Sequence, residues 1–285
     1  MNNTVKTTFL MVLLFVLFWL VGNAIGGRSG GQIALVLAFA MNVFAYFYSD
    51  KVALAAYKAK PVSSADAPVV YRIVKKLTLK AGLPMPKIYI IPTDAANAFA
   101  TGRNPSHAAV AVTAGILKIL SEEELSGVLG HELAHVKHRD ILTGTIVATF
   151  AGAIMFLASM ARWGALFGGF SSDERDSSGG IIGLIVISIV APLAATLIQL
   201  AISRSREYAA DADGARFSGN PLYLAGALSK LEQASKVASI RNAGEATAHL
   251  FIINPLRSRS FAALFSTHPS TEERITRLRK MMGKI

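Results

Sequence analysis

The sequence contains no cysteine among its 285 residues. A chain without cysteine has no disulfide framework and cannot bind zinc through thiolates. Charge is scarce too, since Asp, Glu, Lys and Arg make up 16% of the chain, below the roughly 25% usual in soluble domains. Hydrophobic residues make up 52%, which is more than one soluble core can bury. We therefore expect part of the chain to lie in lipid.

The net charge of +11 admits three partners: nucleic acid, an anionic membrane surface, or the cytoplasmic side of a membrane. No nucleic-acid-binding motif is recognisable, and the basic residues are spread along the chain rather than clustered with aromatic residues. The composition therefore favours a membrane protein and predicts no nucleic-acid partner.

Four apolar runs are long enough to cross a membrane as helices, which takes about 20 residues. They cover residues 7–24, 32–48, 141–163 and 181–202. The short turn GGRSGG separates the first two runs and predicts a helical hairpin. A cleavable signal peptide is the alternative for the first run, but its apolar core is longer than usual. Runs three and four are richer in Ser, Thr and Gly, and buried core helices or helices lying on the membrane are the alternative for them.

The Lys and Arg residues of the polar segments predict how these runs are oriented. Residues 50–140 carry 12 of them and residues 203–285 carry 13, whereas the linker 162–180 carries two and the first turn carries Arg28 alone. Positively charged segments stay on the cytoplasmic side of a membrane. We therefore expect both long polar segments and both termini to face the cytoplasm.

The polar segment between the second and third runs predicts a small α+β unit. Residues 65–83 place apolar side chains at helical spacing, with lysines opposite. Residues 87–91 alternate as a strand does, and residues 97–101 and 108–113 are two further strand candidates, separated by the turn-rich GRNPSH. We expect a small antiparallel sheet followed by helices.

The motif that carries chemistry lies in residues 121–140, SEEELSGVLGHELAHVKHRD. Ser121 and Glu124 form a capping box, so a helix is predicted to begin there. His131 and His135 are four residues apart and share one face of that helix, where both imidazoles can bind one metal ion. Glu132 is placed to take a proton from a water on that metal. The pattern predicts a catalytic zinc site; the alternative is a surface helix with two solvated histidines.

The third metal ligand is harder to identify from spacing. The metzincin pattern, with a third histidine six residues beyond the second, is absent. His138 stands about 10 Å from His131 along the helix axis, too far to share its metal. On a helix that follows the fourth run, Glu207 can bind zinc while Asp211, four residues on, hydrogen-bonds the far nitrogen of a ligating histidine. Alternatively, Glu207 simply pairs with Arg204.

In combination these motifs resemble the HtpX family of membrane zinc metalloproteases, relatives of the eukaryotic CAAX prenyl-protein endopeptidase. The resemblance covers nearly the whole chain: the paired N-terminal runs, NAFATG at residues 97–102, HELAH at 131–135, SRSREYAAD at 203–211 and THPS at 267–270. It implies a gluzincin site with one Zn²⁺ per chain, bound by His131, His135 and Glu207 with Asp211 behind them.

The resemblance also implies a function and a location. The family implies a membrane-embedded, zinc-dependent endopeptidase that cleaves misfolded or damaged membrane proteins as part of stress-related protein quality control. Its place is the bacterial cytoplasmic (inner) membrane, with the catalytic domain facing the cytoplasm, as the charge count also predicts. The expected partners are protein substrates and the lipid bilayer.

The expected fold is α+β and mainly helical, with about four transmembrane helices and a zincin-type catalytic domain. Residues 1–49 form the N-terminal transmembrane hairpin and residues 50–140 the first part of the catalytic domain. Residues 141–202 hold the third and fourth transmembrane helices with their polar linker. Residues 203–285 form the second part of the catalytic domain, with Glu207 and a C-terminal helix over residues 270–282.

Two further residues are candidates for the site. Asn97 begins a predicted edge strand, which could hold an extended substrate by strand addition; a turn-capping asparagine is the alternative. His268, before Pro269, resembles a C-terminal His-Pro element of the family and could stabilise an oxyanion. Equally, His268 could only cap the C-terminal helix.

The expected mechanism is direct attack by water, with Glu132 receiving the water's proton and later protonating the leaving amine. A non-enzymatic membrane zinc sensor or transporter component is the rival from another class. A transporter would place ionisable residues within its spans, and the four runs are nearly free of them. A CAAX-type processing enzyme shares the chemistry but would need more spans.

Overall fold

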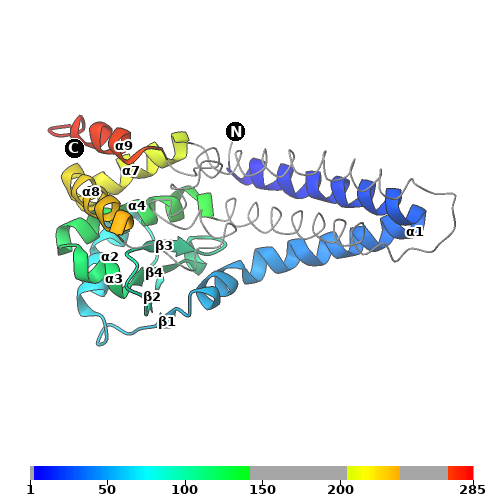
Figure 1. Ribbon diagram of the computed structural model, residues 1–285, viewed down its shortest axis with the longest axis horizontal. Helices are drawn as coiled ribbons and strands as arrows, with labels where there is room; N and C mark the ends of the chain where they lie inside the picture. The colour runs from blue at the N-terminus through cyan, green and yellow to red at the C-terminus, as the bar shows by residue number, and fades with distance from the viewer. Residues whose placement is uncertain (1–2, 142–203, 238–268, 285) are drawn as a thin grey trace.

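The computed structural model describes residues 3–141, 204–237 and 269–284. Within them the chain is mainly helical, with one four-stranded sheet. A long helical hairpin extends away from the sheet and the helices around it (Figure 1). Most of the predicted third run, the whole fourth run and His268 lie outside the described residues.

Helix α1, Asn3–Ala56, contains both N-terminal apolar runs and folds back on itself (Figure 1). The reversal lies in the predicted GGRSGG turn, where Gly27 has a φ of 60°, a left-handed conformation that glycine adopts without strain. The two arms pack closely, since a Cβ on Gly22 would lie 2.4 Å from that of Ala34. Phe18 and Ala38 are buried between the arms.

The surface of α1 is apolar. Within the described residues, Gly27–Tyr48 is long and apolar enough to cross a membrane. Many of the large apolar side chains of α1 are exposed, among them Phe9, Val36, Leu37, Phe39 and Phe44. The described part of the chain provides this one candidate span, so the total of four spans stays a prediction.

The hairpin is followed by β1 (Lys60–Pro61), α2 (Pro68–Ala81) and β2 (Lys87–Ile91). Helix α2 lies where the apolar spacing predicted it, and it buries that apolar face in the main core through Val70, Ile73, Val74, Leu77 and Ala81. Gly82 ends the helix in the left-handed conformation, with a φ of 68°.

The remaining strands are β3 (Ala98–Thr101) and β4 (Ala109–Thr113), with a short 3₁₀ helix, Pro105–His107, between them. The strand order is β1-β2-β4-β3. Strands β2 and β4 are parallel, whereas the other two pairs are antiparallel. The prediction of an antiparallel sheet was therefore wrong: the sheet is mixed. The chain leaving β2 forms β3 at the edge and then returns into the gap, so β4 runs in the direction of β2.

The sheet separates two apolar clusters, because successive side chains of a strand point to opposite faces. Ile88, Val110 and Val112 face the helices and join the main core. Phe99, Ala109 and Ala111 face the other way and pack with Leu54, near the end of α1. The hairpin is thereby attached directly to the sheet.

The other helices are α3 (Ala114–Ile119), α4 (Glu122–His138), α7 (Arg204–Ser218), α8 (Pro221–Val237) and α9 (Thr271–Arg279). The predicted capping box at the start of α4 is confirmed: the Ser121 side chain accepts from the Glu124 backbone, and the Glu124 side chain accepts from the Ser121 N–H. The Ser270 side chain caps α9 by accepting from the Glu273 N–H.

Candidate metal centre

Helix α4 presents the two histidines from one buried face. It crosses the main core between the sheet and helices α7 and α8 (Figure 1). His131 is 1% exposed and Glu132 is 8% exposed, so both side chains are taken out of bulk water. The alternative of a surface helix with two solvated histidines is therefore excluded for His131.

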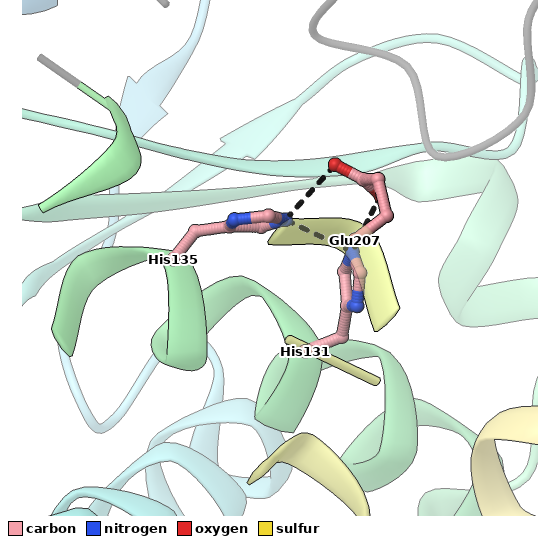
Figure 2. A group of neighbouring side chains, drawn as sticks. All are labelled: His131, His135 and Glu207. Atoms are coloured by element: carbon pink, nitrogen blue, oxygen red, sulfur yellow. Dashed lines mark hydrogen bonds and ion pairs between the residues drawn. The ribbon is translucent and has the colours of Figure 1, made fainter. Parts of the chain in front are cut away.

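Helix α7 brings Glu207 to the same point. The two helices meet without side chains between them. A Cβ on Gly130 would lie 2.7 Å from the Gly214 carbonyl oxygen, and a Cβ on Gly214 would lie 2.6 Å from the backbone nitrogen of His131. Figure 2 shows Glu207 pointing between the two imidazoles. Glycine at both positions is what permits this approach, since any other residue would push the helices apart.

The ligand atoms of the three residues converge. His131 Nε2 and His135 Nε2 are 3.2 Å apart, and the Glu207 carboxylate oxygens lie 3.6 Å from the first and 3.5 Å from the second. Zinc with ligands at 2.0–2.2 Å in a tetrahedron separates neighbouring ligand atoms by about 3.3 Å. The spacing of the three groups therefore fits zinc.

The outer nitrogens of the two histidines each contact a carboxylate. Asp211 Oδ1 lies 2.9 Å from His131 Nδ1, and Asp140 Oδ2 lies 3.2 Å from His135 Nδ1. A carboxylate accepts a hydrogen bond from Nδ1–H, which leaves the Nε2 lone pair free for a metal. Two such lone pairs and a carboxylate facing one point repel one another unless a cation lies between them.

The charges around the centre also favour a divalent cation. A buried guanidinium holds Asp211: Arg274 of α9 donates from Nη2 to Oδ1 at 2.7 Å and from Nε to Oδ2 at 2.9 Å. With neutral histidines, the buried and nearly buried carboxylates and guanidinium groups carry two net negative charges: Glu132, Asp140, Glu207, Asp211, Arg206 and Arg274. A doubly charged ion neutralises that excess.

The same electrostatics acts on the titration of His135. Burial lowers its pKa, but the negative charge of Glu207 and the hydrogen bond to Asp140 outweigh burial and raise the pKa to about 9. A proton therefore competes with a metal ion for His135 at neutral pH.

The two outer carboxylates are held in their ionised form. Burial raises the pKa of Asp211, but the guanidinium of Arg274 and the hydrogen bond from His131 bring it well below its usual range. Burial also raises the pKa of Asp140, but its contacts with His135 and Arg206 outweigh burial, so the pKa lies below its usual value. Both side chains are thus anionic acceptors at neutral pH.

Glu132 is tied to the sheet. Its Oε2 accepts a hydrogen bond from the Ala100 backbone N–H at 2.9 Å. Ala100 belongs to β3, which is an edge strand of the described sheet. The predicted general base therefore lies between the histidine pair and that edge.

The other predicted residues are placed as follows. His138 pairs with Asp213 at 2.8 Å and is not among the three converging ligands, as its distance along the helix predicted. Asn97 immediately precedes β3; it is 3% exposed, and its backbone N–H donates to Thr113 Oγ1. The role of Asn97 in substrate binding stays a prediction, and His268 lies outside the described residues.

Two residues of the centre were missed by the sequence reasoning. Asp140 ends the HELAHVKHRD segment. The left-handed conformation of Arg139 (φ 58°) turns the Asp140 carboxylate toward His135, and this conformation is not evident from the sequence. Arg274 lies far along the chain in a helix with a charged, ordinary-looking sequence, TEERITRLR. No local pattern distinguishes it from the exposed arginines beside it.

The family model "Peptidase family M48" matches residues 64–282. The chain belongs to peptidase family M48. It is 58% identical over 282 residues to a "Protease HtpX homolog" of Syntrophobacter fumaroxidans, covering 99% of this chain and 100% of that protein. A "Protease HtpX homolog" of Pyrococcus furiosus is 52% identical over 277 residues, covering 97% and 95%.

Among solved structures, Ste24p of S. mikatae resembles this M48 chain with a TM-score of 0.58. The sequences are 19% identical, and the match covers 97% of this chain and 64% of Ste24p. The likeness at this identity shows a shared fold, and this chain corresponds to about two thirds of the longer protein.

The family confirms the predicted resemblance to HtpX proteases. The M48 chain is accordingly a membrane metalloprotease, a peptide-bond hydrolase, and His131, His135 and Glu207 could hold the metal that such an enzyme requires. The comparisons give no support to the rival, a non-enzymatic zinc sensor or transporter component.

Proposed function

We propose that this chain is a zinc-dependent endopeptidase of the bacterial cytoplasmic membrane that cleaves misfolded or damaged membrane proteins. The observation that carries the proposal is the convergence of His131, His135 and Glu207, whose ligand atoms all lie within 4.8 Å of one another. Two imidazoles and one carboxylate are a ligand set of catalytic zinc sites, which keep a fourth position open.

Zinc would supply Lewis acidity, polarising the scissile carbonyl and lowering the pKa of a water to about 7. Glu132 is the residue placed to take the water's proton and to deliver a proton to the leaving amine. Its hydrogen bond from Ala100 keeps the carboxylate beside the edge strand. An extended peptide that adds to β3 by main-chain hydrogen bonds would thus pass next to the base.

The proposed orientation places the catalytic part and both termini in the cytoplasm, with four spans. Asp140 and Arg206 support it, since their side chains lie 3.8 Å apart. These residues stand at the two ends of the segment that holds the predicted third and fourth runs. A segment whose ends meet leaves and re-enters the catalytic part on the same side of the membrane. A site this near the membrane suits substrates embedded in it.

Replacing the base tests the mechanism. Glu132→Gln in the full-length protein should lower the rate of cleavage of a detergent-solubilised membrane protein by about 10²–10⁴-fold, because general base catalysis is lost. Zinc content, measured by mass spectrometry, should stay at one per chain. Glu123→Gln, in the exposed first turn of the same helix, is the control and should cleave at the parent rate. A fully active Glu132→Gln enzyme contradicts the assignment.

Metal binding is tested separately. Because the pKa of His135 is raised to about 9 in the absence of metal, zinc binding at pH 7.5 should release about one proton. Calorimetry in buffers of different ionisation enthalpy measures that number. Because the folded-state pKa of His135 is raised, proton binding to His135 stabilises the metal-free protein. This stabilisation is complete below the unfolded-state pKa of about 6.5 and is lost as the pH rises through the folded-state pKa of about 9. Protein that binds no zinc refutes the proposed function.

A further inference from the structure

Each of the two histidines has its own carboxylate partner, and the partner of His135 is Asp140. Its Oδ2 lies 3.2 Å from His135 Nδ1, and the residue is 8% exposed. The arrangement repeats on the second histidine what Asp211 does for His131 at 2.9 Å. Asp211 belongs to α7 and Asp140 follows the end of α4, so the two carboxylates reach the centre from separate parts of the chain.

We propose that Asp140 is a positioning residue, which holds His135 as the Nδ1–H tautomer with its Nε2 lone pair directed at the metal position. This inference rests on the proposed zinc site. In water the imidazole would exchange freely between tautomers, and a carboxylate at Nδ1 fixes one of them and the orientation of the ring.

The local backbone explains how Asp140 reaches the ring. Helix α4 ends at His138, and Arg139 takes the left-handed conformation, so that the chain changes direction directly after the last turn. The carboxylate one residue later then returns toward His135 instead of continuing along the helix axis. A residue five positions beyond the histidine could not contact the ring if the helix went on, because five residues turn it well away from that face.

Asp140 is itself held from two sides. Arg206 Nε lies 3.8 Å from its Oδ1, and His138 Nδ1 lies 3.8 Å from its Oδ2. His138 in turn pairs with Asp213 at 2.8 Å. Arg206 directly precedes the ligand Glu207 in α7. Through this ion pair, the start of α7 and the end of α4 set the position of one histidine together.

The decisive measurement is zinc affinity of the full-length protein in detergent, determined by competition with a chromophoric chelator. Asp140→Asn keeps the size of the side chain and removes its charge, and we expect zinc to bind 10–100-fold more weakly. Asp213→Asn is the matched control, since it makes the same change one contact further from the ring; its zinc affinity should stay within about twofold of the parent. The thermal unfolding of both metal-free variants shows whether a loss reflects the fold.

Unchanged zinc affinity in Asp140→Asn overturns the inference, and so does an equal loss in Asp213→Asn. Wild-type protein without zinc binding overturns the proposed function as well, which separates the two failures. A measurement on the wild-type protein decides the matter even where Asp140→Asn does not fold. In zinc-loaded protein with ¹⁵N-labelled histidine, the His135 signal, identified by its loss in His135→Gln, should report Nδ1–H and a metal-bound Nε2. A ring bound through Nδ1 overturns the proposal.

Discussion

The hairpin of α1 and the unit around α4 distribute apolar and charged side chains in opposite ways. In the hairpin, Val36 is 69% exposed and Phe39 is 62% exposed, whereas Asn42 is buried. Around α4 the apolar side chains form a closed core and the exposed surface is rich in charge. The charges buried there, such as Glu132 and Arg274, gather at the metal centre.

This difference shows that the two regions have different surroundings. Exposed apolar side chains at this density cost free energy in water and none in lipid. Buried charges cost free energy in either medium unless each has a partner. The hairpin is therefore suited to a membrane, and the stability of the catalytic part depends on complete pairing of its buried charges.

Removing a buried charge of the unit around α4 should have the largest effect on stability. Arg274→Met leaves Asp211 buried without its guanidinium, and we expect the free energy of unfolding to fall by about 3–5 kcal/mol. Arg277→Met, three residues on, removes an exposed arginine that pairs with Glu273 and should cost less than about 1 kcal/mol. Denaturant unfolding in detergent measures both. Equal losses would mean that burial of the charge is not what matters.

Adding a charge to an exposed apolar position should separate the two regions directly. Val36→Lys places an ammonium near the middle of the candidate span, at a cost of about 2.5–3.5 kcal/mol for membrane insertion. Leu79→Lys changes a residue of α2 that is 76% exposed and should alter stability by less than about 0.5 kcal/mol. Carbonate extraction of membranes measures the fraction of each variant that stays in the membrane. Full retention of the Val36 variant would argue against lipid around α1.

A smaller effect on stability is expected where α4 and α7 touch. Gly130→Ala directs a methyl group at the Gly214 carbonyl and should cost about 1–3 kcal/mol by overpacking, with weaker zinc binding. Gly226→Ala in α8 is the control, because the atoms nearest to its methyl group belong to the flexible Glu124 side chain, the closest at 3.2 Å. That variant should be neutral or slightly stabilised. Unfolding and chelator competition measure both properties, and an unaffected Gly130→Ala protein would show that the helices can separate freely.

The parts of this protein that sequence predicts are those set by local physics. The capping box at Ser121 and Glu124, the spacing of His131 and His135 and the amphipathic face of α2 each depend on residues within a few turns. All three are present. Spacing alone left Glu207 undecided between binding metal and pairing with Arg204. The family resemblance favoured metal binding. Spacing could not decide, because the approach of α7 to α4 depends on Gly130 and Gly214, which lie far apart in the sequence.

The parts that sequence did not predict depend on tertiary arrangement. The parallel pairing of β2 with β4 follows from where the chain inserts its last strand, and the strand residues themselves suit either direction. Asp140 reaches the centre through a change of backbone direction at Arg139, and Arg274 reaches it through the docking of α9. Neither event has a sequence pattern of its own.

The direct contact between α4 and α7 also restricts which ions the enzyme can accept. Because the backbones of α4 and α7 approach each other closely at Gly130 and Gly214, the spacing of the three candidate ligands depends on this contact. Calcium requires six to eight oxygen ligands at 2.3–2.6 Å, which neither the spacing nor the two imidazoles offer. The helix contact thus favours the smaller zinc ion proposed for this site over calcium.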